Sequence, residues 1–154
     1  MGLTLQFLIG DKRQIIGFVK DEDFDGLERI EDLGIADFSF HLIPNDLNLL
    51  VNAASEVAGL QKFGLREHLD FQEFYFDAED RGACFVNPRI KELFSMFNPD
   101  QAVDISKTWV KKMEKEHNEE IGVNDDIVES VRQLILLSKN SVAKNIDLVH
   151  LWFG

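Results

Sequence analysis

Acidic side chains recur at alternate positions in one short segment of the chain. Asp21, Asp23 and Asp25 are followed directly by Gly26, and Asp32 comes six residues after that glycine. Ca²⁺ takes six to eight oxygen ligands, and a twelve-residue calcium loop supplies them from positions one, three, five and twelve, with a glycine at position six for the sharp turn. Numbered from Asp21, the segment meets these positions. Its chemistry would be calcium binding, which we keep as one alternative.

The same twelve residues resemble the loop of an EF-hand, with three departures. Position twelve is Asp32 where an EF-hand has the longer Glu, and position eight is the charged Glu28 where such loops place an apolar residue. Residues 35–42 predict a strand where the second helix of an EF-hand would run. The sequence therefore favours an exposed acidic loop that leads into a short helix, and we assign no metal ligand.

A second group of carboxylates surrounds a predicted hairpin. Glu73 and Asp77 share one face of the predicted strand, but at the rise of a strand they stand roughly 14 Å apart, too far for a paired acid and base. A small carboxylate-based hydrolase in this region is a second alternative, and an exposed hairpin tip is the favoured interpretation. The acidic residues concerned are Glu67, Asp70, Glu73, Asp77, Glu79 and Asp80.

Histidine and cysteine give little support for metal or nucleophile chemistry. The four histidines lack the spacing of zinc ligands, and Cys84 lies in an apolar run typical of a buried, unreactive thiol. A nucleophilic pair of Cys84 with His41 or with His150 is compatible with the predicted strands, but we do not favour it. Glycine-rich phosphate loops and nucleophile elbows are absent from the sequence. We expect no cofactor, leave enzymatic activity uncertain and favour a protein that is not an enzyme.

The elements that must position these residues follow from hydrophobic periodicity and from helix caps. Alternating apolar residues predict strands, and apolar residues three or four positions apart predict helices. The three prolines, Pro44, Pro88 and Pro99, stand where a helix can begin. The predicted strands cover residues 3–9, 14–20, 36–42, 71–76, 82–86 and 146–153, and the predicted helices cover residues 24–33, 44–58, 88–97, 99–113 and 124–144. Residues 14–20 also fit a buried helical turn, but we favour the strand.

This mixed order of elements predicts an α+β fold rather than a regularly alternating α/β fold. We expect a single domain over residues 1–154, with a mixed or antiparallel sheet of about five to six strands packed against about four to five helices. A chain of this length buries roughly two-thirds of its unfolded surface, which is enough for one hydrophobic core. Strand order and oligomeric state are left open.

The net negative charge of the chain makes some classes of binding partner unfavourable. The chain has 28 acidic and 16 basic residues, a net charge of −12, which opposes binding to nucleic acid and to anionic membrane surfaces. No unbroken apolar run exceeds four residues, whereas a membrane span needs about 20. The single cysteine, Cys84, cannot form an internal disulfide, so we expect a reducing, cytoplasmic location.

The acidic residues are unevenly distributed. Residues 21–37 hold eight acids and one base, a net charge of −7. Concentrated negative charge accelerates association with a positively charged partner. We therefore predict a protein-interaction module, similar in action to an immunity protein or an inhibitor, that binds a basic protein. The predicted partner-binding residues are Asp21, Glu22, Asp23, Asp25 and Glu28.

Overall fold

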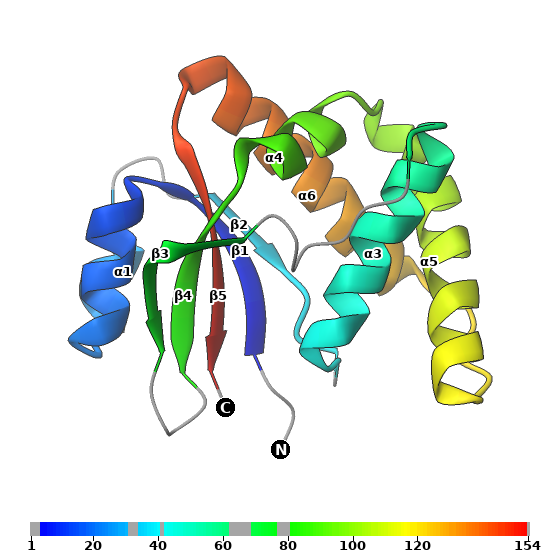
Figure 1. The fold of residues 1–154 in the computed structure, drawn as a ribbon, viewed down its shortest axis with the longest axis horizontal. Helices are drawn as coiled ribbons and strands as arrows, with labels where there is room; N and C mark the ends of the chain where they lie inside the picture. Colours follow the sequence, from blue (N-terminus) through cyan, green and yellow to red (C-terminus); the bar gives the residue numbers. More distant parts are fainter. Residues whose placement is uncertain (1–3, 31–33, 41, 62–68, 77–80, 154) are drawn as a thin grey trace.

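A computed structural model shows an α+β fold built on one antiparallel sheet (Figure 1). It describes residues 4–30, 34–40, 42–61, 69–76 and 81–153. Within these residues the sheet has five strands in the order β2-β1-β5-β4-β3, and every neighbouring pair is antiparallel. The strands are β1 (Thr4–Gly10), β2 (Gly34–Asp37), β3 (Leu69–Phe76), β4 (Gly82–Val86) and β5 (Asp147–Phe153).

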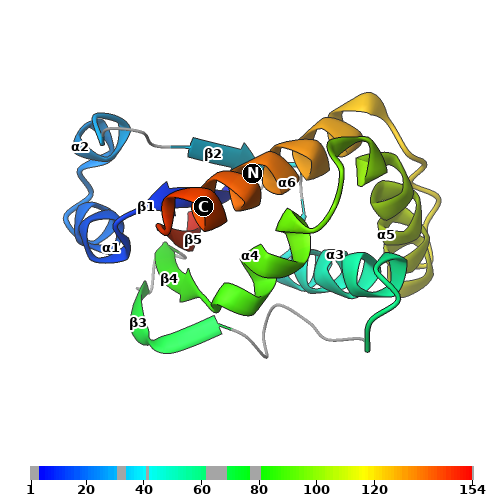
Figure 2. The same ribbon diagram turned by 90° about the horizontal axis from the view of Figure 1, so that it is seen from above.

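Helices cover both faces of the sheet (Figure 2). The described residues contain six α-helices and one 3₁₀ turn, Pro99–Gln101, whereas the sequence predicted about four to five helices. The helices are α1 (Lys12–Lys20), α2 (Phe24–Glu28), α3 (Pro44–Val57), α4 (Pro88–Ser95), α5 (Ala102–His117) and α6 (Asp125–Lys144). The helices α1 and α2 lie on one side of the sheet. The other four lie on the opposite side, where α4 and α6 pack on the strands and α3 and α5 lie beyond them.

The alternation along β1 explains why the core has two parts. Leu5, Phe7 and Ile9 are buried in the larger core with α3 to α6. Leu8 points to the other face and packs in the smaller core, which includes Ile15 of α1. Because successive side chains of a strand point to opposite faces, one strand contributes to both layers of packing.

Local capping sets where the later helices begin. Asn87, Asn98 and Asn124 each accept a backbone N–H in the first turn that follows, at 2.9 to 3.1 Å. Pro44 opens α3, and there the carboxylate of Asp46 accepts the backbone N–H of Ile43 at 2.9 Å. These bonds satisfy donors that a helix leaves unpaired at its start. The helix starts predicted from the prolines and asparagines are confirmed.

Two predicted strands differ from the structure. Residues 14–20, predicted as a strand, belong to α1, where Ile15 and Val19 lie one turn apart and are both buried. The side chain of Asp11 accepts the N–H of Gln14 at 2.9 Å and starts this helix. A short apolar run fits both the alternation of a strand and the spacing of a helix, and the Asp11 cap favours the helix. The strand predicted over residues 36–42 is shorter, because β2 ends at Asp37.

Candidate functional site

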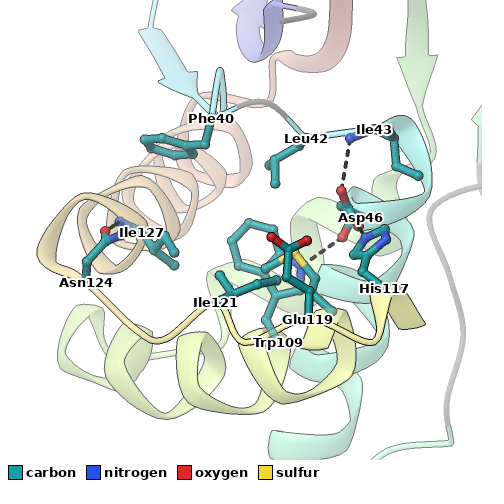
Figure 3. Close-up of a pocket in the computed structure, with 11 residues that line it drawn as sticks. Phe40, Leu42, Ile43, Asp46, Trp109, His117, Glu119, Ile121, Asn124 and Ile127 are labelled. Carbon is teal, nitrogen blue, oxygen red and sulfur yellow. Dashed lines mark hydrogen bonds and ion pairs between the residues drawn. The ribbon is translucent and has the colours of Figure 1, made fainter. Parts of the chain in front are cut away.

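A pocket of about 430 Å³ opens between α3, the end of α5, the start of α6 and the segment that follows β2 (Figure 3). We call it the α3–α5 pocket. Its wall is largely apolar, with a few polar groups near the ends of the helices. The lining residues are Phe40, Leu42, Ile43, Asp46, Trp109, Met113, His117, Glu119, Ile121, Asn124 and Ile127.

A hydrogen-bonded pair of ionisable residues stands at one side of this pocket. Asp46 is only 4% exposed, and its Oδ1 lies 2.6 Å from Nε2 of His117. The other carboxylate oxygen accepts the backbone N–H of Ile43. The backbone oxygen of Asp46 accepts the indole N–H of Trp109 at 2.8 Å. These bonds fix the first turn of α3 against the end of α5.

The pair favours a charged histidine. The hydrogen bond with Asp46 and the negative charge of that carboxylate raise the pKa of His117, and the charges of Glu116 and Glu119 act in the same direction. The lining residues that the structure describes include no hydroxyl, thiol, lysine or arginine side chain. The described lining therefore offers a bound molecule mainly apolar contacts, with carboxylates at Asp46 and Glu119.

The loop between α5 and α6 forms the wall of the pocket that carries Glu119 and Ile121. After α5, the backbone turns at Asn118, which adopts a left-handed conformation with φ of 51°. The carboxylate of Glu114 then accepts the N–H groups of Ile121 at 2.8 Å and of Gly122 at 3.2 Å. Because these bonds return the loop onto α5, the wall is held in place by the helix itself.

A second pocket, of about 320 Å³, lies against α2. We call it the α2 pocket. Most of its wall comes from β1, β2, β5 and α2, and the rings of Phe24 and Phe153 lie 5.2 Å apart within it. The α2 pocket is lined by Gln6, Leu8, Phe24, Leu27, Glu28, Ile35, Leu151 and Phe153.

The five predicted partner-binding residues lie close together in the sequence, and one of them, Glu28, lines the α2 pocket. They lie on the turn between α1 and α2 and on α2 itself, and all five are exposed: Asp21, Glu22, Asp23, Asp25 and Glu28, which we call the acidic face.

Part of the acidic face also has a structural role. Asp23 caps α2 by accepting the N–H of Gly26 at 2.9 Å, and Glu22 forms an ion pair with Arg81. Residues 24–28 are helical, so the middle of the predicted calcium loop is a helix here, and Asp32 lies outside the described residues. In the part of the chain that the structure describes, no three or more acidic, histidine or cysteine side chains form a group that could hold a metal ion.

The alternative that we did not favour, a nucleophilic pair of Cys84 with a histidine, can be compared with the sheet and with the pKa values of the two groups. Cys84 of β4 and His150 of β5 are register partners, whereas His41 lies outside the described residues. Burial raises the pKa of Cys84 to about 12. Burial also lowers the pKa of His150 to about 4, although its hydrogen bond to the oxygen of Gln6 acts in the opposite direction. Both groups are therefore neutral at pH 7, and the thiolate needed for a nucleophile does not form.

Most of the six acidic residues noted around the predicted hairpin lie outside the described residues. Asp70 and Glu73 lie within β3, whose pairing with β4 shifts register between Asp70 and Phe74. Glu67, Asp77, Glu79 and Asp80 lie outside the described part of the chain.

The chain matches no known protein family, no curated protein and no solved structure. Among the helices described here, none combines the length and the apolar character that a membrane span requires.

The α3–α5 pocket was not predicted from the sequence. Asp46 and His117 are 71 positions apart, so no local spacing connects them. One signal was present, because a carboxylate two residues after Pro44 suits a capping role at the start of α3. That signal places Asp46 in the first turn, but it does not indicate which side chain from another helix will contact it.

Proposed function

We propose that this protein is an interaction module that binds a basic protein through the acidic face and the α2 pocket together. The observation that carries the proposal is the position of Glu28, which belongs to the acidic face and also lines the apolar pocket. Negative charge and an apolar cavity therefore meet at one place on the surface.

The charge of the acidic face is largely uncompensated. Glu22 pairs with Arg81, but within the described residues no cation pairs with Asp21, Asp25 or Glu28. Exposed charges of one sign raise the rate of encounter with a partner of the opposite sign, and salt screens that effect. A basic partner would therefore associate quickly at low ionic strength.

The α2 pocket supplies the apolar part of the interaction. Ile35 lines it and is 44% exposed, and the rings of Phe24 and Phe153 contribute further apolar wall. Binding energy at protein interfaces concentrates in a few buried apolar anchors, with charged residues at the rim. The partner that fits has an apolar side chain flanked by lysine or arginine, as the surface of a cationic enzyme would present to an immunity-like inhibitor.

The test begins with the intact chain as bait and the basic protein that it captures. Association and dissociation rates of this pair are measured between 50 and 300 mM salt. For the double variant Asp25→Asn with Glu28→Gln, we expect association to slow by about tenfold and its salt dependence to flatten. The charge-matched control is Asp104→Asn with Glu92→Gln, two exposed carboxylates on other helices, and it should bind like the wild type.

A second comparison tests the pocket. Ile35→Ser should speed dissociation, whereas Leu136→Ser, which changes a residue of α6 that is 45% exposed, should not. Failure to capture a basic protein would refute the proposal. Association that ignores salt and both charge variants would show that the acidic face does not guide binding, and equal effects of the two serine variants would remove the α2 pocket from the interface.

A further inference from the structure

We infer that the α3–α5 pocket is a binding site for a small organic cation, a molecule with an apolar body and one protonated amine. This site is separate from the acidic face: the α2 pocket lies on the side of the sheet covered by α1 and α2, and the α3–α5 pocket lies among the helices of the other side (Figure 2). The inference therefore goes beyond the interaction with a basic protein.

The size and lining of the pocket suit a small molecule. Its volume of about 430 Å³ falls within the range of roughly 300 to 1,000 Å³ that such sites occupy. Figure 3 shows Phe40 and Leu42 on one side and Trp109 and Ile121 on the opposite side of the space between them. Met113 and Ile127 complete the apolar part of the lining.

The charges in the lining select the sign of the ligand. A proton on His117 would balance only the carboxylate of Asp46, to which it is hydrogen-bonded, so the carboxylate of Glu119 stays unbalanced in either protonation state of the histidine. No cation pairs with Glu119 within the described residues, and the described lining has neither lysine nor arginine. The pocket therefore carries a net negative charge, which attracts a cation and opposes a carboxylate or a phosphate.

The surroundings of Glu119 strengthen this preference. A shallow depression beside the α3–α5 pocket is lined by Glu114, Asn118, Glu119 and Glu120, so the approach to the site is acidic as well. The ring of Phe40, which is partly exposed, is also a group that can accommodate an organic cation, because ring faces attract positive charge. The apolar wall, this ring and the unpaired carboxylate of Glu119 thus favour the same chemical class.

The experiment compares three probes of one shape. The intact chain is titrated with 4-phenylbutylammonium, with 4-phenylbutanol and with 4-phenylbutyrate, by calorimetry and by NMR of the indole N–H signals. The chain has two tryptophans, so a Trp152→Phe background leaves Trp109 as the reporter inside the pocket. We expect the ammonium probe to bind at least tenfold more tightly than the alcohol or the carboxylate and to shift the Trp109 signal.

Two pairs of variants locate the binding. Ile121→Trp places a large side chain into the pocket and should abolish binding, whereas Val123→Trp, in the same loop but outside the lining, should leave it intact; the two residues are 39% and 42% exposed. Glu119→Gln should reduce the affinity for the ammonium probe to that for the alcohol, and Glu92→Gln on α4 should have no effect. Thermal unfolding confirms that each variant is folded before titration.

Three results would overturn the inference. The first is no response of Trp109 to millimolar ammonium probe, the second is equal or tighter binding of the carboxylate probe, and the third is an Ile121→Trp variant that binds like Val123→Trp. Because none of these variants touches the acidic face, failure here leaves the proposed interaction with a basic protein to be judged by its own test.

Discussion

The buried His150 makes a quantitative prediction for stability in acid. Its side chain is 4% exposed, its ring lies 4.9 Å from that of Phe7, and burial lowers its pKa from 6.5 to about 4. An unfolded chain accepts a proton on this histidine below about pH 6.5, whereas the folded chain resists it until about pH 4, so stability falls as the pH decreases through this window. At 1.36 kcal/mol for each pH unit, the loss amounts to roughly 3 kcal/mol.

The assay is urea unfolding followed by circular dichroism at several pH values between 6.5 and 4. In His150→Gln, the side-chain amide can still donate to the backbone oxygen of Gln6, but the side chain no longer titrates. We expect the free energy of unfolding to fall more steeply in the wild type than in this variant, with a difference of about 3 kcal/mol accumulated by pH 4. His117→Gln serves as control and should keep the steep acid slope. Identical acid slopes for wild type and His150→Gln would refute the reasoning.

Three further predictions concern His117, Trp109 and Cys84. Because Asp46 raises the pKa of His117, this pair stabilises the fold fully below about pH 6.5 and less as the pH rises through the pKa of His117 in the folded chain. The free energy of unfolding should therefore fall more in the wild type than in His117→Gln between pH 6.5 and 8.5. An equal fall in the two proteins would contradict the bond to Asp46. Trp109→Phe should lower the free energy of unfolding by roughly 2.5 kcal/mol, about 1 from the indole hydrogen bond and about 0.8 for each of the two lost ring carbons. The loss in Trp152→Phe should be smaller. Urea unfolding measures both, and a loss under about 1 kcal/mol in Trp109→Phe would contradict the buried bond. Burial raises the pKa of the Cys84 thiol to about 12, so in the folded chain this thiol should resist iodoacetamide at pH 8, and in urea it should react. Mass spectrometry follows the labelling. Rapid labelling of the folded chain would show an accessible thiolate.

Features controlled by local chemistry were predictable from the sequence. Asn124 begins α6, and the helix ends at Lys144, as the cap and the apolar period indicate. The α+β class and the hairpin of β3 and β4 follow from the same kind of signal. The segment 14–20 was predicted wrongly, because four apolar residues in seven fit two periods and the deciding contact comes from the side chain of Asp11, outside the segment.

The candidate sites also differ in how far the sequence could predict them. The acidic face is contiguous in sequence, so its composition alone placed it on the surface. The α3–α5 pocket depends on how α3 and α5 pack, and the contact between Asp46 and His117 exists only after helices far apart in the chain have come together. The α2 pocket likewise requires Glu28 and Phe153 to meet across 125 positions of sequence. The spacing of residues within one helix or strand does not indicate which residues of other elements will contact it in the folded chain.

The position of β5 has a consequence for how the molecule folds. It follows every other described element in sequence, yet it lies between β1 and β4 and is the strand that joins the β1–β2 pair to the β3–β4 hairpin. Until β5 is in place, those two parts of the sheet share no hydrogen bonds across it. Pairings over such long separations must close large loops before they contribute stability, which slows folding. We therefore expect the pairing of β5 with β1 and β4 to limit the rate of folding, so that substitutions that weaken this pairing slow refolding in stopped-flow measurements.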